Sequence, residues 1–100
     1  MDGAERPKAV PTVQIENDRV RVTEWRFERG AATGWHRHEF DYVIVPLLTG
    51  TLRLEEGGTV RDAELTAGHP YFREAGVEHD VINASEGGFA FVEVELKERP

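Results

Sequence analysis

Residues 30–38 read GAATGWHRH and residues 68–83 read GHPYFREAGVEHDVIN, and the fold of the chain can be predicted from these two segments. In the first segment His36 and His38 are two residues apart. On an extended backbone this spacing points both side chains to the same face. A facing pair of neutral imidazoles is half of a transition-metal site. Taken alone, however, such a pair is more often a surface or hydrogen-bonded pair.

Short runs of β-branched and aromatic residues, separated by glycine, surround the two segments, and no window has helical apolar spacing. Alternation in residues 51–55 and 92–96 predicts strands with one face toward water. Residues 42–48 are continuously apolar, as expected of a strand covered on both sides or at a subunit contact. This pattern is typical of an all-β sandwich or barrel. The predicted strands are Val20–Phe27, Tyr42–Leu48, Thr51–Glu55, Val60–Leu65, Pro70–Arg73, Asp80–Asn83 and Phe89–Leu96.

The length of 100 residues fits one compact domain and is too short for two. Residues 1–11 contain two prolines and several charges with little hydrophobic pattern, and they predict a flexible N-terminal arm. Residues 12–100 are then expected to form the barrel.

Composition excludes several classes of protein. The net charge of −7 argues against a nucleic-acid partner, because phosphate binding needs clustered Lys and Arg. No apolar run approaches the length of a membrane span, and the N-terminal residues lack the apolar stretch of a signal peptide. There is no cysteine, so disulfides, thiolate metal sites and a cysteine nucleophile are excluded. We therefore expect a soluble cytoplasmic protein that binds neither nucleic acid nor membrane.

The two histidine segments together resemble the two signature motifs of the cupin superfamily, in the right order and over roughly residues 17–96. The resemblance implies a cupin fold, a double-stranded β-helix or jelly-roll barrel. It also implies that His36, His38 and His79 bind one divalent transition metal ion, Fe, Zn, Ni or Mn, inside the barrel. Among cupins the chain is similar to minimal single-domain bacterial members and to a group associated with β-alanine breakdown. The positions that match the motifs are Gly30, His36, His38, Gly50, Gly68, Gly76, His79 and Asn83.

The chain departs from these motifs at two points. Glu74 replaces the proline of the second motif, which is expected to alter only a turn. The first motif has a glutamate three or four residues after its second histidine, where this chain has Tyr42 and then Val43. Strand parity places Tyr42 on the face of the histidines, and Tyr42 is expected to be a catalytic hydrogen-bond donor rather than a strong ligand, because a phenol ionises near pH 10.

Three charged residues in the segment from His36 to Tyr42 are expected on the opposite face, where their alternating charges are typical of a surface. They are Arg37, Glu39 and Asp41. The alternative is a strand bulge that turns Asp41 inward. His69 lies outside the motifs and is expected at the surface or at the rim of the pocket.

Three neutral imidazoles leave a charge of about +2 around a divalent ion, which favours an anionic small-molecule substrate. The leading hypothesis is a metal-dependent enzyme, a dioxygenase, isomerase or lyase, acting on a small organic acid or related metabolite. The alternatives are a non-enzymatic cupin that binds or senses a small molecule, and a barrel whose histidines are vestigial. We also expect a homodimer, with contacts through residues 43–48 and the N-terminal arm.

Overall fold

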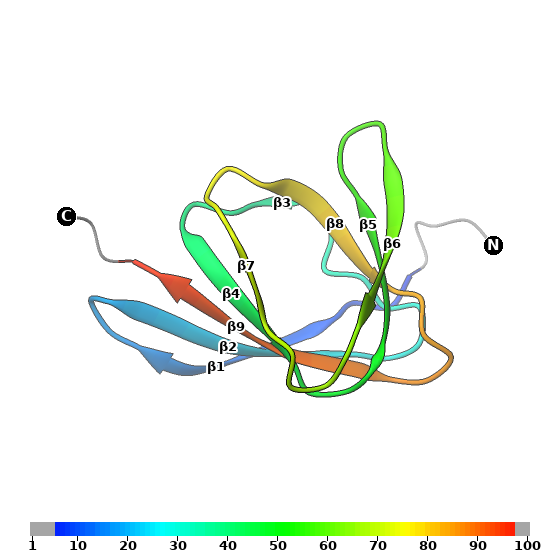
Figure 1. Cartoon of the computed structure of the whole chain (residues 1–100), viewed down its shortest axis with the longest axis horizontal. Helices are drawn as coiled ribbons and strands as arrows, with labels where there is room; N and C mark the ends of the chain where they lie inside the picture. The colour runs from blue at the N-terminus through cyan, green and yellow to red at the C-terminus, as the bar shows by residue number, and fades with distance from the viewer. Residues whose placement is uncertain (1–5, 98–100) are drawn as a thin grey trace.

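The computed structural model describes residues 6–97, and this part of the chain folds into nine β-strands joined by loops and turns (Figure 1). The strands are β1 (Val10–Glu16), β2 (Val20–Phe27), β3 (His36–Arg37), β4 (Asp41–Pro46), β5 (Gly50–Glu55), β6 (Val60–Leu65), β7 (Tyr71–Arg73), β8 (Glu78–Asn83) and β9 (Phe89–Leu96).

These strands form two antiparallel sheets. One sheet has the order β1-β2-β9-β4-β7, and the other has the order β3-β8-β5-β6. Figure 1 shows the two sheets curving around a common interior, with β9 between β2 and β4. The expected all-β jelly-roll barrel is confirmed. Within residues 6–97 there is no helix with the length and apolar character needed to cross a membrane.

Most strands lie where the sequence pattern predicted them. β2, β6 and β9 begin and end at the predicted residues, and β4, β5, β7 and β8 differ from the prediction only near their ends. β1 and β3 were not predicted as strands. All residues of β1 are exposed, so it lacks the alternation that marks a half-buried strand. β3 has only two residues, too few to show a period.

The predicted N-terminal arm, residues 1–11, ends inside β1. Near its end Ala9 is buried, and the backbone N–H of Ala9 donates to the carbonyl oxygen of Ala32 at 3.0 Å. Residues 1–5 lie outside the described residues. The arm and its boundary with the barrel therefore stay predictions.

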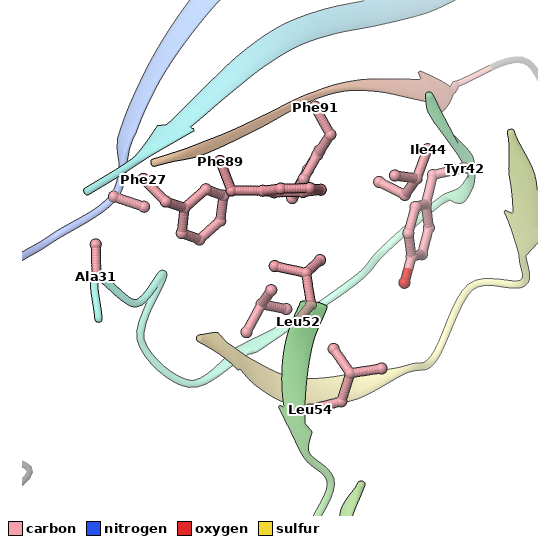
Figure 2. Close-up of a cluster of buried hydrophobic side chains, with 10 residues drawn as sticks. Phe27, Ala31, Tyr42, Ile44, Leu52, Leu54, Phe89 and Phe91 are labelled. Atoms are coloured by element: carbon pink, nitrogen blue, oxygen red, sulfur yellow. The ribbon is translucent and has the colours of Figure 1, made fainter. Parts of the chain in front are cut away.

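The core is formed by alternate residues of the strands, which point into the space between the sheets. The rings of Phe27 and Phe91 lie 5.5 Å apart between their centroids, in a tilted arrangement. Burying each large apolar side chain stabilises the fold by about 1.5–3 kcal/mol. Figure 2 shows the main members of this cluster, which are Phe27, Ala31, Tyr42, Ile44, Leu52, Leu54, Phe89 and Phe91.

Two motif residues hold the loop before β9 against the rest of the barrel. A Cβ atom on Gly50 would collide with the Ser85 hydroxyl and lie 2.8 Å from the Phe89 ring, so only glycine fits there. The buried side chain of Asn83 donates to the carbonyl oxygens of Glu28 and Gly87 at 3.1 and 2.9 Å. Its Oδ1 accepts from the backbone N–H of Ser85 at 2.9 Å.

We expect Asn83→Ala to lower the free energy of unfolding by about 3 kcal/mol, because it removes several hydrogen bonds and leaves their partners buried and unsatisfied. Asn17→Ala is the matched control. Asn17 also accepts from two backbone N–H groups, those of Arg19 and Val20, but at an exposed turn. Removing the Asn17 side chain should lower the free energy of unfolding by less than about 1 kcal/mol, since water replaces the acceptor. Urea unfolding measures both values, and equal losses would contradict this account of Asn83.

Candidate metal centre

Strand pairing brings the three predicted histidines together. β3 pairs with β8 in the register that sets His36 directly opposite His79. Beyond β3, the backbone N–H of His38 donates to the carbonyl oxygen of Val77 at 2.9 Å, and the N–H of Gly76 donates to that of His38 at 2.8 Å. These bonds keep the segment extended after β3, so His38 stays on the face of His36.

The Nε2 atoms of the three imidazoles converge. The distance between the Nε2 atoms of His36 and His38 is 3.0 Å, and that between His38 and His79 is 3.1 Å. The ring planes cross at steep angles of 70° to 85°, so the rings meet at their edges rather than stacking. The three side chains therefore form a group that could hold a metal ion.

Contacts on the other ring nitrogens indicate which nitrogen carries hydrogen. The Nδ1 of His36 lies 2.9 Å from the carbonyl oxygen of Gly34, which can only accept, so this Nδ1 donates. The Nδ1 of His38 lies 3.3 Å from a carboxylate oxygen of Glu93, which accepts when Glu93 is ionised. In the neutral form of each ring the Nε2 then carries a lone pair. Lone pairs facing each other at about 3 Å repel unless a cation lies between them, so the donor set fits a metal ion.

Burial keeps two of the rings neutral. It lowers the pKa of His38 to about 3, and the neighbouring rings of His36 and His79 add to the effect. Burial likewise lowers the pKa of His79 to about 4. At neutral pH both imidazoles are in the form that binds metals.

Tyr42, on β4, lies against the histidines as strand parity predicted. Its ring stacks on the His38 ring, with 3.9 Å between centroids and 16° between planes. Figure 2 shows the side chain pointing from β4 into the interior of the barrel, where the side chains of Leu52 and Leu54 also lie. The hydroxyl is buried and has no hydrogen-bond partner among the described residues. Burial raises the pKa of Tyr42, so the phenol stays protonated and can donate a hydrogen bond.

Glu93 is the site residue that sequence reasoning missed. The alternation in residues 92–96 predicted a strand with one face toward water, and it did not show that Glu93 is buried, with 7 % exposure. Parity showed that Glu93 and Glu95 share a face, but it could not tell which face is the barrel interior. One Glu93 oxygen accepts from the indole N–H of Trp25 at 2.8 Å, and the other faces His38. Burial raises the pKa of Glu93 to about 7.

The other charged candidates lie away from the imidazole cluster. Arg37 is exposed, contributes to the cavity wall and forms an ion pair with Glu78 at 3.4 Å. Asp41 accepts from the backbone N–H of Ala75 at 2.8 Å and is not in a potential metal-binding group among the described residues. The alternative in which a bulge turns Asp41 toward the metal is therefore not what this structure shows. His69 is exposed and also lies outside the cluster.

A cavity of about 390 Å³ lies beside the imidazoles. Part of its wall is apolar, from side chains that include Ile44, Leu52 and Phe91. Another part is polar, because Glu95 and Arg21 line it as an ion pair with 2.7 Å between Nε and Oε1. The cavity can accommodate a small molecule that has both apolar and polar groups.

We expect Tyr42→Phe to leave the free energy of unfolding unchanged or to raise it by up to about 1 kcal/mol, because it removes a buried hydroxyl without a partner. Thermal or urea unfolding of the metal-free protein measures this. A loss of more than about 1 kcal/mol would show that the hydroxyl makes a stabilising hydrogen bond in the folded protein.

A family model described as Cupin domain matches residues 23–95. The Beta-alanine degradation protein BauB of Pseudomonas aeruginosa is 62% identical over 92 residues, which are 92% of this chain and 97% of that protein.

Solved structures give the same result. The crystal structure of a cupin domain from Bordetella pertussis Tohama I is 56% identical, with a TM-score of 0.92 over 94% of this chain and 98% of that one. The polyketide cyclase RemF from Streptomyces resistomycificus is 24% identical, with a TM-score of 0.71 over 96% of this chain and 72% of that one. At that identity the likeness to RemF concerns the fold alone.

Proposed function

The chain belongs to the cupin domain family, and from that premise we propose that it is a metal-dependent enzyme acting on a small organic acid in or near β-alanine degradation. The name of the Pseudomonas aeruginosa relative supports the metabolic setting. The observation that carries the proposal is the convergence of three imidazole Nε2 atoms on one point beside a cavity.

We propose His36, His38 and His79 as the ligands of one divalent transition metal ion. Fe, Zn, Ni and Mn all accept imidazole, and the Nδ1 contacts leave lone pairs on at least two of the Nε2 atoms. The ion would supply a Lewis acid that binds and polarises an oxygen atom of the substrate, as expected of a dioxygenase, isomerase or lyase.

The residues around the imidazoles would bind and orient the substrate. Ile44, Leu52 and Phe91 exclude water from one side of the cavity. An ionised Glu93 lowers the charge of the loaded site from about +2 to about +1, which still favours a carboxylate ligand. The Tyr42 hydroxyl has no partner among residues 6–97, and it would donate a hydrogen bond to the substrate or pass it a proton.

Metal analysis tests the proposed ligands. Wild-type protein dialysed against Zn²⁺ or Fe²⁺ should retain about one ion per chain, and His36→Ala should retain much less than that. His69→Ala is the control, because it removes an exposed histidine away from the cluster and should leave the stoichiometry unchanged. Equal metal content in His36→Ala and wild type would contradict the assignment.

Turnover separates an enzyme from a binding protein. The metal-loaded protein should consume oxygen or convert substrate when it is given β-alanine or related short carboxylic acids, and Tyr42→Phe should keep the metal and lose that activity. Binding of such an acid without turnover would favour a non-enzymatic cupin that binds or senses a metabolite. Absence of both would reject a small organic acid as its ligand.

We also propose that two copies associate through the outer face of the five-stranded sheet. Register places one apolar residue from each strand in a continuous row across this face. The row consists of Ile15, Val22, Val94, Val43 and Phe72. Its end residues Ile15 and Phe72 are 50% and 52% exposed.

Charge on the same face is compatible with a second copy as the partner. Glu24 and Arg26 lie on this face and already pair with each other at 3.1 Å, so neither brings an unpaired charge to a two-fold contact. Val43 also belongs to the segment 43–48 that the sequence pattern assigned to a subunit contact.

Val43→Lys should convert the dimer to a monomer of 11.3 kDa, because it places a charge in the middle of the apolar row. Val60→Lys is the control, since Val60 is 61% exposed on β6 of the other sheet and should leave the dimer intact. Sedimentation at micromolar concentration distinguishes the two states. A monomeric wild type would reject the proposal.

A further inference from the structure

Glu93 is a buried residue with one carboxylate oxygen bonded to Trp25 and the other close to an imidazole nitrogen of His38. Its Oε1 accepts from the indole N–H of Trp25 at 2.8 Å, and its Oε2 lies 3.3 Å from the Nδ1 of His38. These three side chains come from β2, β9 and the segment just after β3, so the contact joins the two sheets.

An ionised carboxylate at position 93 can accept a hydrogen bond from both partners. The indole nitrogen of Trp25 is a donor and never an acceptor, so it occupies one oxygen whatever state His38 is in. The second oxygen is then the partner for His38 and requires hydrogen on Nδ1. An amide at position 93 would offer one acceptor and one NH₂ group, and one of the two contacts would become unfavourable.

The three imidazoles are held in different ways. The Nδ1 of His36 faces the backbone carbonyl of Gly34, which no substitution removes. The Nδ1 of His79 is buried and has no hydrogen-bond partner among the described residues. His38 is held at Nδ1 by Glu93 and on its ring face by Tyr42. The group next to the Nδ1 of His38 is therefore a carboxylate side chain and not a main-chain group.

We propose that Glu93 is a positioning residue that fixes His38 in the tautomer with hydrogen on Nδ1 and so directs the Nε2 lone pair toward His36 and His79. The inference rests on the proposed metal site and goes beyond it, since it assigns the tautomer to one side chain outside the ligand set. Carboxylates that orient a metal-binding histidine contribute about 10- to 100-fold to metal affinity.

Three variants test the role of Glu93. In Glu93→Gln the amide oxygen is drawn to Trp25 and its NH₂ group faces His38, which favours the tautomer with hydrogen on Nε2. Zn²⁺ affinity, measured by calorimetry, should fall about 10- to 100-fold.

In the double variant Trp25→Phe with Glu93→Gln, the amide is free to turn its oxygen to His38, and Zn²⁺ affinity should recover at least about fivefold relative to Glu93→Gln. Glu24→Gln removes the same charge from a carboxylate on the outer face of the sheet that pairs with Arg26, and it should change affinity less than about threefold.

Nitrogen NMR of the metal-free protein reads the tautomer directly. His38 should carry hydrogen on Nδ1 in the wild type and in the double variant, and on Nε2 in Glu93→Gln. This readout does not depend on metal binding. A wild type that binds no Zn²⁺ therefore overturns the proposed metal site, while the NMR result still decides the role of Glu93.

Two results would overturn the role of Glu93. An unchanged tautomer in Glu93→Gln would show that His38 is held by something else. A double variant no tighter than Glu93→Gln would show that the carboxylate acts through its charge alone. Circular dichroism of each variant excludes loss of the fold as the cause.

Discussion

The pairing of β3 with β8 is the contact on which the site depends. Its register sets His36 opposite His79, and the backbone hydrogen bonds that follow hold His38 on the same face. Main-chain groups therefore bring the three imidazoles together, with neighbouring Nε2 atoms 3.0 and 3.1 Å apart. Side chains outside the cavity can change without moving these rings, as long as the pairing is kept.

This arrangement has a cost in stability. Burying the His79 Nδ1 and the Tyr42 hydroxyl without partners among the described residues is unfavourable by about 1–3 kcal/mol for each group. The barrel offsets this with an aromatic cluster that includes Phe27, Phe89 and Phe91, and with the hydrogen bonds of Asn83. Polar groups that lower stability and yet are kept in an interior are typical of functional sites.

The sequence predicted what depends on local period and spacing. Runs of β-branched and aromatic residues located β2, β6 and β9 to the residue, and the spacing of two placed His36 and His38 on one face with Tyr42. β1 was not predicted from the sequence because its pairing is set by β2 and not by burial of one of its own faces. Glu93 was not predicted because strand parity shows only which residues share a face. It does not show whether that face meets water or a cavity.

The position of β9 has a consequence for the order in which the chain acquires structure. β9 is the last of the nine described strands in sequence, yet it lies between β2 and β4 in the middle of its sheet. A ribosome makes β2 and β4 first, so each of them has one unpaired edge until β9 emerges. That same strand supplies Phe91 to the core and Glu93 to the imidazoles. During synthesis the nascent barrel thus has an open seam, and a single late strand closes the sheet, completes the core and encloses the histidines.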